Sequence, residues 1–269
     1  MLIGGSAALV TSGFVLGHSI PARATPSRRG GMQPAIAPVN VAVGLDIYPR
    51  SAWGADLPPT GVITRPEDVR FLLVHHTASP NTVPMGGTAT VLREIYAYQT
   101  GPAKGWPDVC YEFFVDPDGL VWEGREGALN GSVVADATGG SQGFAQLVCL
   151  VGDFTSVLPT VAQQAGLVRV LAWLADRNHL DTTPGATTTF VSRGSQRWAA
   201  GVTVTAKTVS GHRDMSSTEC PGNAFYPVVR DQMQALVTAA RGPSGPSATQ
   251  ALGTLLHGGR VPTPLRPSR

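Results

Sequence analysis

Residues 211–222 contain the two side chains best suited to metal chemistry in this sequence. The stretch reads GHRDMSSTECPG and places His212 and Cys220 eight positions apart. Both lie next to residues that favour turns, since a glycine precedes the histidine and Pro-Gly follows the cysteine. Imidazole and thiolate are common zinc ligands, but a catalytic zinc usually takes three protein ligands and leaves a fourth position to water. A third donor must come from elsewhere in the chain.

The candidate third donor ends an apolar run. Residues 71–76 read FLLVHH, a run of strand length that closes with His75 and His76. Neighbouring side chains of a strand point to opposite faces, so one histidine can face the metal while the other packs or orients. A zinc ion on two imidazoles and one thiolate would lower the pKa of its bound water towards ~7 and polarise a carbonyl group. This set is suited to amide hydrolysis.

Other apolar runs predict the strands that position these residues. They lie at residues 109–115, 120–123 and 145–151, and Asp-Pro-Asp-Gly at 116–119 predicts a turn between the first two. Together with the strand that ends in the two histidines, they alternate with helical segments. We therefore expect a mixed α/β fold with one central, mostly buried β-sheet covered by helices, and the zinc site at one face of the sheet.

Three helices are predicted from apolar spacing and caps. The first begins at Thr88, stops before Gly101-Pro102, and has Val91, Ile95 and Tyr98 on its apolar side. The second begins with a capping box at Thr160 and continues to about residue 175. The last is capped by Asn223.

The two ends of the chain differ from its middle. Residues 1–24 carry an apolar run and a small-x-small cleavage site, which predicts a signal peptide, although no Lys or Arg precedes the run and a retained N-terminal anchor is the alternative. Residues 25–45 are a flexible leader rich in Pro and Gly. Residues 46–240 form the folded domain, and an insertion at 181–209 contains a short hairpin. Residues 241–269, with five Pro and five Gly, are expected to be disordered.

Charge separates these regions as well. The domain holds 13 of the 20 basic residues and all 18 acidic ones, so its net charge is −5, whereas both ends are basic. A slightly acidic domain argues against a nucleic-acid partner, which requires a basic face. The N-terminal apolar run is too short and too interrupted by Gly and Ser for stable membrane insertion. The basic ends are either solvated tails or favour loose contact with an anionic surface.

Several separated motifs complete the pattern. In chain order they are His75–Ala78, Gly105-Trp106, Tyr111-x-Phe113, Glu123–Arg125, Gly152–Phe154, Gly211–Asp214 and Thr218–Gly222. Their order and rough spacing resemble those of the type 2 N-acetylmuramoyl-L-alanine amidases, a family that includes the catalytic peptidoglycan recognition proteins. The resemblance covers about residues 46–240. It implies a zinc enzyme that cuts the bond between the lactyl group of N-acetylmuramic acid and the L-Ala of the stem peptide.

The resemblance assigns roles residue by residue. It implies that His75, His212 and Cys220 hold one Zn²⁺ and that Tyr111 lies over the site and helps to polarise the substrate or water. Thr218 matches a position that holds Lys in some relatives. A threonine hydroxyl can hydrogen-bond a developing oxyanion but supplies no charge.

Three further residues are the expected substrate contacts, namely Thr77, Trp106 and Arg125. A plain strand end would also explain Thr77, and core packing would also explain Trp106. His76 is expected to be structural, and Arg213 with Asp214 to form an ion pair that fixes the loop.

The sequence departs from the family at two positions. One branch has a catalytic Glu where this chain has Cys149, and a thiol is a poor general base, so that role falls on Tyr111 or on the zinc-bound hydroxide itself. Many relatives carry Gly-Ala-His where residues 134–136 here read Val-Ala-Asp. Assigning Cys220 to zinc leaves Cys110 and Cys149, which an exported protein could join. Strand alternation favours two free thiols instead, because it points their side chains to opposite faces.

The sequence therefore predicts a secreted or cell-wall-associated zinc amidase, monomeric, whose partner is peptidoglycan. Two alternatives remain. A peptidoglycan-binding module without turnover is the first, and the presence of Cys220 speaks against it. A phage-type endolysin with the same chemistry is the second, and the export signal speaks against it.

Overall fold

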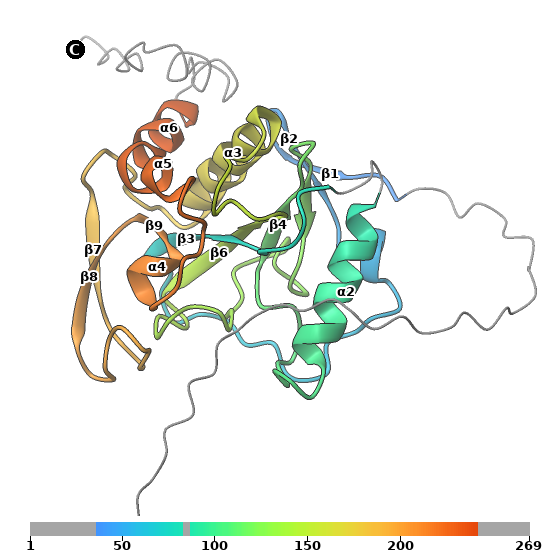
Figure 1. Ribbon diagram of the computed structural model, residues 1–269, viewed down its shortest axis with the longest axis horizontal. Coiled ribbons are helices and arrows are strands. Elements are labelled where there is room, and N and C mark those ends of the chain that lie inside the picture. Colours follow the sequence, from blue (N-terminus) through green and yellow to red (C-terminus); the bar gives the residue numbers. More distant parts are fainter. Residues whose placement is uncertain (1–35, 83–86, 242–269) are drawn as a thin grey trace, which may run out of the picture. The chain divides into compact units, whose positions relative to one another are not determined.

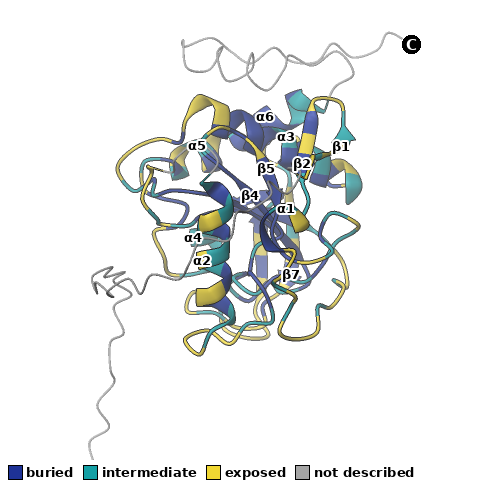
Figure 2. Cartoon of the chain, turned by 90° about the vertical axis from the view of Figure 1, so that its right-hand side faces the viewer, coloured by how far each residue is buried: buried dark blue, intermediate teal, exposed yellow. Residues whose placement is uncertain are grey.

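Seven strands form one mixed sheet in the computed structural model, which describes residues 36–82 and 87–241 (Figure 1). Across the sheet they are β1 (Val39–Ala42), β2 (Leu45–Tyr48), β5 (Val121–Glu123), β4 (Phe113–Val115), β6 (Ala145–Leu150), β3 (Phe71–His76) and β9 (Val209–Gly211). The last four are parallel neighbours, whereas β1 with β2 and β4 with β5 are antiparallel pairs. The mixed α/β class with one central sheet is confirmed, and its strands are largely buried (Figure 2).

Helices cover both faces of the sheet. α3 (Val161–Arg177), α5 (Tyr226–Asp231) and α6 (Met233–Ala240) lie on one side, and α2 (Thr88–Thr100) lies on the other (Figure 1). The short helix α1 (Ser51–Gly54) packs with α2. α3 starts where the capping box predicts, because the Thr160 hydroxyl accepts a hydrogen bond from the Gln163 N–H at 3.0 Å.

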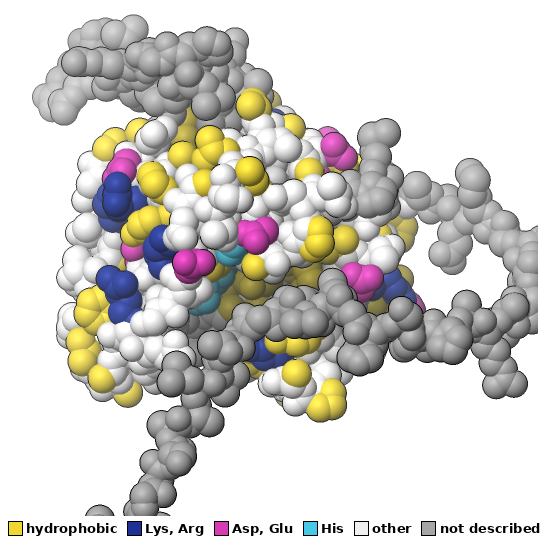
Figure 3. Space-filling view, in the orientation of Figure 1, with side chains coloured by type: hydrophobic (Ala, Val, Ile, Leu, Met, Phe, Trp, Pro, Cys, Tyr) yellow, Lys and Arg dark blue, Asp and Glu magenta, His cyan; other side chains and the backbone are white. Residues whose placement is uncertain are grey.

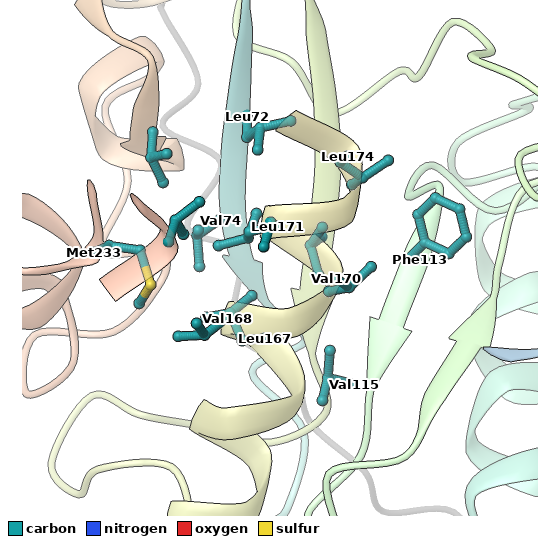
Figure 4. Close-up of a cluster of buried hydrophobic side chains, with 14 of the residues drawn as sticks. Leu72, Val74, Phe113, Val115, Leu167, Val168, Val170, Leu171, Leu174 and Met233 are labelled. Atoms are coloured by element: carbon teal, nitrogen blue, oxygen red, sulfur yellow. The ribbon is translucent and has the colours of Figure 1, made fainter. Parts of the chain in front are cut away.

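The largest core cluster lies between the sheet and α3 (Figure 4). Alternate residues of β3, Leu72 and Val74, face Leu167 and Leu171 of α3, and all four side chains are fully buried. The intervening residues, Phe71 and Leu73, belong to a different cluster, so they face the opposite side. His75 continues this second series and therefore points away from α3.

A hairpin covers part of that opposite face. β7 (Thr187–Val191) and β8 (Thr203–Lys207) form a separate two-stranded antiparallel sheet within the 181–209 insertion. Phe190 of the hairpin stacks on Phe71 with ring centroids 5.4 Å apart. After β9 the chain forms one helical turn, α4 (His212–Met215), and Met215 joins the same cluster. The insertion is thus joined to the element that carries His212.

Two details in the first half of the chain differ from the sequence expectations. β1 lies within the range predicted as leader, so the sheet begins before residue 46. α2 buries Leu92, Tyr96 and Gln99, whereas Tyr98 is 44% exposed, so its inner face is rotated from the predicted one. Gln99 turns inward because its amide bonds Cys110, a contact beyond the end of the helix that apolar spacing does not reveal.

The C-terminal helix also differs. It is divided into α5 and α6 at Gln232, and Asn223 bonds the Glu219 carboxylate at 3.1 Å instead of capping a helix.

Several predicted segments lie outside the described residues. These are the signal peptide at 1–24, most of the 25–45 leader and residues 242–269 of the tail. Among the helices of the described part, none combines the length and the apolar character needed to cross a membrane.

Candidate metal centre

Two parallel strands bring the histidines together. Val74 of β3 pairs with Gly211 of β9. The residues that follow this pair are His75 and His212, so the two histidines lie side by side. The rings of His75 and His212 lie with their centroids 4.3 Å apart. Side chains at the carboxyl ends of parallel strands meet at one edge of a sheet, which is where binding sites of open α/β sheets form.

Cys220 completes the cluster from the loop after α4. Its Sγ lies 3.6 Å from His75 Nδ1, and one donor atom from each of the three residues lies within 4.8 Å of the other two. For zinc bonds of 2.3 Å to sulfur and about 2.05 Å to nitrogen, a tetrahedral angle separates the two ligand atoms by about 3.6 Å. The sulfur–nitrogen distance therefore matches a tetrahedral zinc site.

The surroundings of His75 are those of a ligand and not of an ordinary core histidine. The residue is fully buried, and its Nε2 has no hydrogen-bond partner in the part of the chain that the structure describes. A buried polar atom without a partner is rare in a core. The neighbour of the other ring nitrogen is the Cys220 sulfur. A cation bound between Nδ1 and the sulfur would bind both of these atoms, so the donor set fits zinc.

The protonation states of the ligands agree with this role. Burial lowers the pKa of His75 well below its usual value, and nearby His212 and His76 lower it further. Burial likewise lowers the pKa of His212 to about 4. Both imidazoles are therefore neutral at pH 7, the form in which histidine binds a metal.

Tyr111 borders the cluster. Its ring centroid lies 5.0 Å from that of His75, and its backbone carbonyl accepts the Arg125 N–H at 2.9 Å. Burial raises the pKa of the Tyr111 phenol well above its usual value, and the nearby Cys110 adds to the effect. The phenol therefore stays protonated at neutral pH and can donate a hydrogen bond.

Arg125 lies buried behind the Tyr111 segment. Only 2% of the residue is exposed, and its guanidinium bonds the Asp136 carboxylate at 2.5 Å and the Val109 carbonyl at 3.2 Å. Asp136, one of the residues that departs from the family pattern, thus has a structural partner here.

The remaining predicted site residues lie around the cluster. The Thr77 hydroxyl accepts the Gly152 N–H at 2.8 Å and lies 2.7 Å from the Ser79 hydroxyl. Thr218 is exposed, and its hydroxyl accepts the Cys220 N–H at 3.2 Å. Trp106 is half-buried, with the Lys104 ammonium 5.2 Å from its ring centre.

The predicted pair of Arg213 with Asp214 has different partners. The Asp214 carboxylate accepts the Gly211 N–H at 2.8 Å and the Tyr226 hydroxyl at 2.5 Å. The Arg213 guanidinium bonds the Glu219 carbonyl and lies over the Tyr226 ring at 4.5 Å. Both residues fix the ligand loop, but through separate contacts. Asp214 lies three positions after the N-cap Gly211, and an acidic residue at that position often bonds the N-cap N–H. This signal could have predicted the contact of Asp214 with Gly211.

The three cysteines are free thiols. Cys110 is buried and its sulfur accepts a hydrogen bond from the Gln99 amide at 3.1 Å. Cys149 is also buried and pairs with His75 across β6 and β3, on the same face of the sheet. The expectation of free thiols is confirmed for Cys110 and Cys149.

The centre opens onto one face of the molecule. Figure 3 shows histidine side chains in a hollow beside a floor of apolar side chains, with basic and acidic side chains around them. Such a mixture suits a ligand with both apolar and polar parts.

Comparison with known proteins agrees with this arrangement. The family profile described as N-acetylmuramoyl-L-alanine amidase matches residues 65–223, which include all three donors. The N-acetylmuramoyl-L-alanine amidase of Homo sapiens is 32% identical over 190 residues, which is 68% of this chain and 28% of that protein. Peptidoglycan-recognition protein SC2 of Drosophila simulans is 26% identical over 188 residues, which is 70% of this chain and 86% of that protein.

Solved structures share the fold. Bumblebee PGRP-SA superposes with a TM-score of 0.54 at 16% identity, covering 71% of this chain and 96% of that one. Peptidoglycan recognition protein LE, solved with tracheal cytotoxin, gives a TM-score of 0.51 at 22% identity, covering 68% and 92%. The chain spans only about a quarter of the human and pig amidases that it matches, at 28% and 27% of their lengths.

Proposed function

This chain belongs to the N-acetylmuramoyl-L-alanine amidase family, and on that premise we propose that it is a zinc-dependent amidase. The reaction is hydrolysis of the amide bond between the lactyl group of N-acetylmuramic acid and the L-Ala of the stem peptide in peptidoglycan. One observation carries the proposal, the convergence of His75, His212 and Cys220 with donor atoms within 4.8 Å of one another. A cluster of two imidazoles and one thiol provides three ligands and leaves a fourth position for water or substrate.

The ligands have distinct roles in this proposal. His75 and His212 bind as neutral imidazoles, and Cys220 binds as a thiolate after losing its proton. When bound, zinc supplies a Lewis acid for the scissile carbonyl and lowers the pKa of water to about 7.

Tyr111 and Thr218 act on the substrate. The protonated phenol of Tyr111 donates a hydrogen bond to the carbonyl oxygen, and this bond strengthens as negative charge develops there. Its raised pKa makes Tyr111 a donor and not a general base at neutral pH. The Thr218 hydroxyl accepts the Cys220 N–H, which leaves its own proton for the same oxyanion.

The substrate contacts are proposals of the same kind. Trp106 offers a half-buried ring face next to Lys104, which suits a sugar or a peptide carboxylate. Thr77 lies one residue beyond β3 and presents its hydroxyl near Ser79. For Arg125 we propose an indirect role, because its guanidinium is committed to Asp136.

The substrate sets the location and partners of this enzyme. Peptidoglycan lies outside the cytoplasmic membrane, so the proposal includes export with residues 1–24 as signal peptide. The protein would act as a monomer, with peptidoglycan as its polymeric partner and no nucleic acid.

The test is digestion of purified muropeptides with the zinc-loaded protein, followed by mass spectrometry. We expect release of free stem peptides with an L-Ala amino terminus. Cys220→Ser should lose both zinc and activity, whereas Cys110→Ser, which replaces a buried thiol outside the three-residue cluster, should retain zinc.

Binding without cleavage would support a different function. The relatives named recognition proteins make peptidoglycan binding the second candidate. A zinc-loaded protein that retains muropeptides and releases no amino termini would overturn the amidase proposal in its favour.

A further inference from the structure

The helical turn that carries His212 has its carbonyl groups bound by an insertion. α4 comprises only His212–Met215, too short to satisfy its own C-terminal carbonyls. The His212 carbonyl accepts the Ser216 N–H at 3.0 Å, which leaves those of the next three residues to be accounted for.

Three donors from the hairpin loop bind these three carbonyls in turn. Arg197 Nη1 donates to the Arg213 carbonyl at 3.0 Å, and Trp198 Nε1 donates to the Asp214 carbonyl at 2.9 Å. Ser195 Oγ donates to the Met215 carbonyl at 2.8 Å. The three donors fall within four consecutive residues of the loop between β7 and β8.

The loop is itself held in a defined conformation. The Ser195 hydroxyl accepts the N–H groups of Arg197 and Trp198 at 3.2 and 3.0 Å. The same hydroxyl donates its one proton to the Met215 carbonyl. Its single donor and both of its acceptor positions are therefore used. The Ser195 N–H donates to the Trp198 carbonyl at 2.8 Å, which closes the turn.

The hairpin is anchored in the core below the loop. Phe190, Val204 and Ala206 are buried in the cluster that includes Met215, and Trp198 packs against it. The Arg193 N–H also donates to the Gly140 carbonyl at 2.8 Å. The loop therefore connects α4 to a fixed part of the sheet.

We propose that Ser195, Arg197 and Trp198 form a clamp that positions His212 for the metal centre. The clamp fixes the last three carbonyls of α4, and hence the orientation of the turn from which the imidazole projects. The Asp214 carboxylate is fixed separately by Tyr226 and by the Gly211 N–H, so both the backbone and a side chain of α4 are held. Outer partners of this kind orient metal ligands, and losing one typically weakens metal binding by about 10- to 100-fold. This inference rests on the proposed metal centre but not on amide hydrolysis.

The experiment compares two Trp→Phe variants of the full chain. Trp198→Phe keeps the ring but removes the N–H that bonds the Asp214 carbonyl. Trp173→Phe is the matched control, because Trp173 is half-buried in α3 and its Nε1 has no hydrogen-bond partner among the described residues. Zinc affinity is measured by competition with a chelator, and the geometry of the centre is followed by the visible spectrum of the cobalt(II)-substituted protein.

We expect Trp198→Phe to weaken zinc binding by about 10-fold and to alter the cobalt spectrum, while Trp173→Phe changes neither. Ser195→Ala should act like Trp198→Phe, and Ser195→Thr, which keeps a hydroxyl, should restore most of the affinity. Equal affinities and spectra in all four variants and the wild type would overturn the clamp, as would a wild-type protein that binds no zinc. If Trp198→Phe and Ser195→Ala lower the melting temperature but leave the zinc affinity unchanged, the contacts only stabilise the fold and the clamp is overturned. A wild type that binds zinc without cleaving muropeptides would overturn the amidase proposal alone.

Discussion

The backbone N–H of His76 donates a hydrogen bond to the Cys220 sulfur over 3.4 Å. The ring of the same residue is turned away, and its Nδ1 accepts the N–H of Phe154 at 3.2 Å. Burial raises the pKa of Cys220 to about 12, and the His76 amide opposes this rise by stabilising the thiolate. His76 thus supports the centre through its backbone, while its side chain fixes the neighbouring loop.

Zinc should stabilise the fold through Cys220. At a free zinc concentration 1,000 times the dissociation constant, binding to the native state alone adds about 4 kcal/mol to the free energy of unfolding. Cys220→Ser should lose most of this gain and Cys110→Ser should keep it, in denaturant titrations with zinc and with a chelator. A zinc-dependent gain of equal size in Cys220→Ser would show that its sulfur is not a ligand.

Removal of the Tyr111 hydroxyl should slow the chemical step. In Tyr111→Phe we expect kcat to fall by about 10²- to 10³-fold, the usual cost of losing one donor to a developing oxyanion, with zinc content unchanged. Tyr48→Phe is the control, since Tyr48 stacks on Trp122 with ring centroids 4.3 Å apart and is not part of the metal cluster. A higher KM with unchanged kcat would instead assign Tyr111 to substrate binding.

Gly222, two residues after Cys220, should tolerate no side chain. Its φ is +103°, and a Cβ atom there would lie 2.3 Å from the backbone carbonyl of Phe154. Gly185 has a similar φ of +90° with no atom within 4 Å of the added carbon. Gly185→Ala should therefore cost only the backbone strain, about 1–3 kcal/mol, whereas Gly222→Ala should cost clearly more and weaken zinc binding. Urea unfolding of both variants checks this, and equal losses would contradict it.

Glu112 should make stability depend on pH. This carboxyl group is fully buried, with Gln146 Nε2 at 2.9 Å and the Leu147 N–H at 2.8 Å, and burial raises its pKa from 4.5 to about 8. Between these values the folded state holds a proton that the unfolded state has released, so the free energy of unfolding falls as pH rises.

Glu112→Gln removes this ionisation. Between pH 6.5 and 8 the histidines with lowered pKa values are mostly neutral in both the folded and the unfolded state. In this range the free energy of unfolding of the wild type should fall by up to about 1.4 kcal/mol per pH unit relative to the variant. Urea unfolding across that range measures the difference. A gap between the two proteins that stays constant with pH would show that Glu112 does not titrate there.

Part of the candidate centre was predictable because its information is local. Residue type and spacing identified His212 and Cys220 as donors and left His75 and His76 open, and the family resemblance favoured His75. The structure brings His75, His212 and Cys220 together. The cap at Thr160 likewise predicted the start of α3.

Contacts between distant polar groups were not predictable in this way. The inward turn of Gln99, the bond from Tyr226 to Asp214 and the bonds from the hairpin loop to α4 each join segments that only the folded sheet brings together. Several of them end on backbone carbonyls, which every residue carries, so no pattern of side chains marks them. The bounds of α2 were predicted correctly, but its inner face was predicted wrongly for this reason, and the contacts of the hairpin with α4 were not predicted at all.

The candidate metal donors also come from distant parts of the chain, since His75 and Cys220 are 145 positions apart. His212 follows the last strand of the sheet, so a chain that ends before β9 has only one of the three. An ion can be trapped only after that strand has docked beside β3. A nascent chain that has not yet reached Cys220 therefore lacks the complete set of donors.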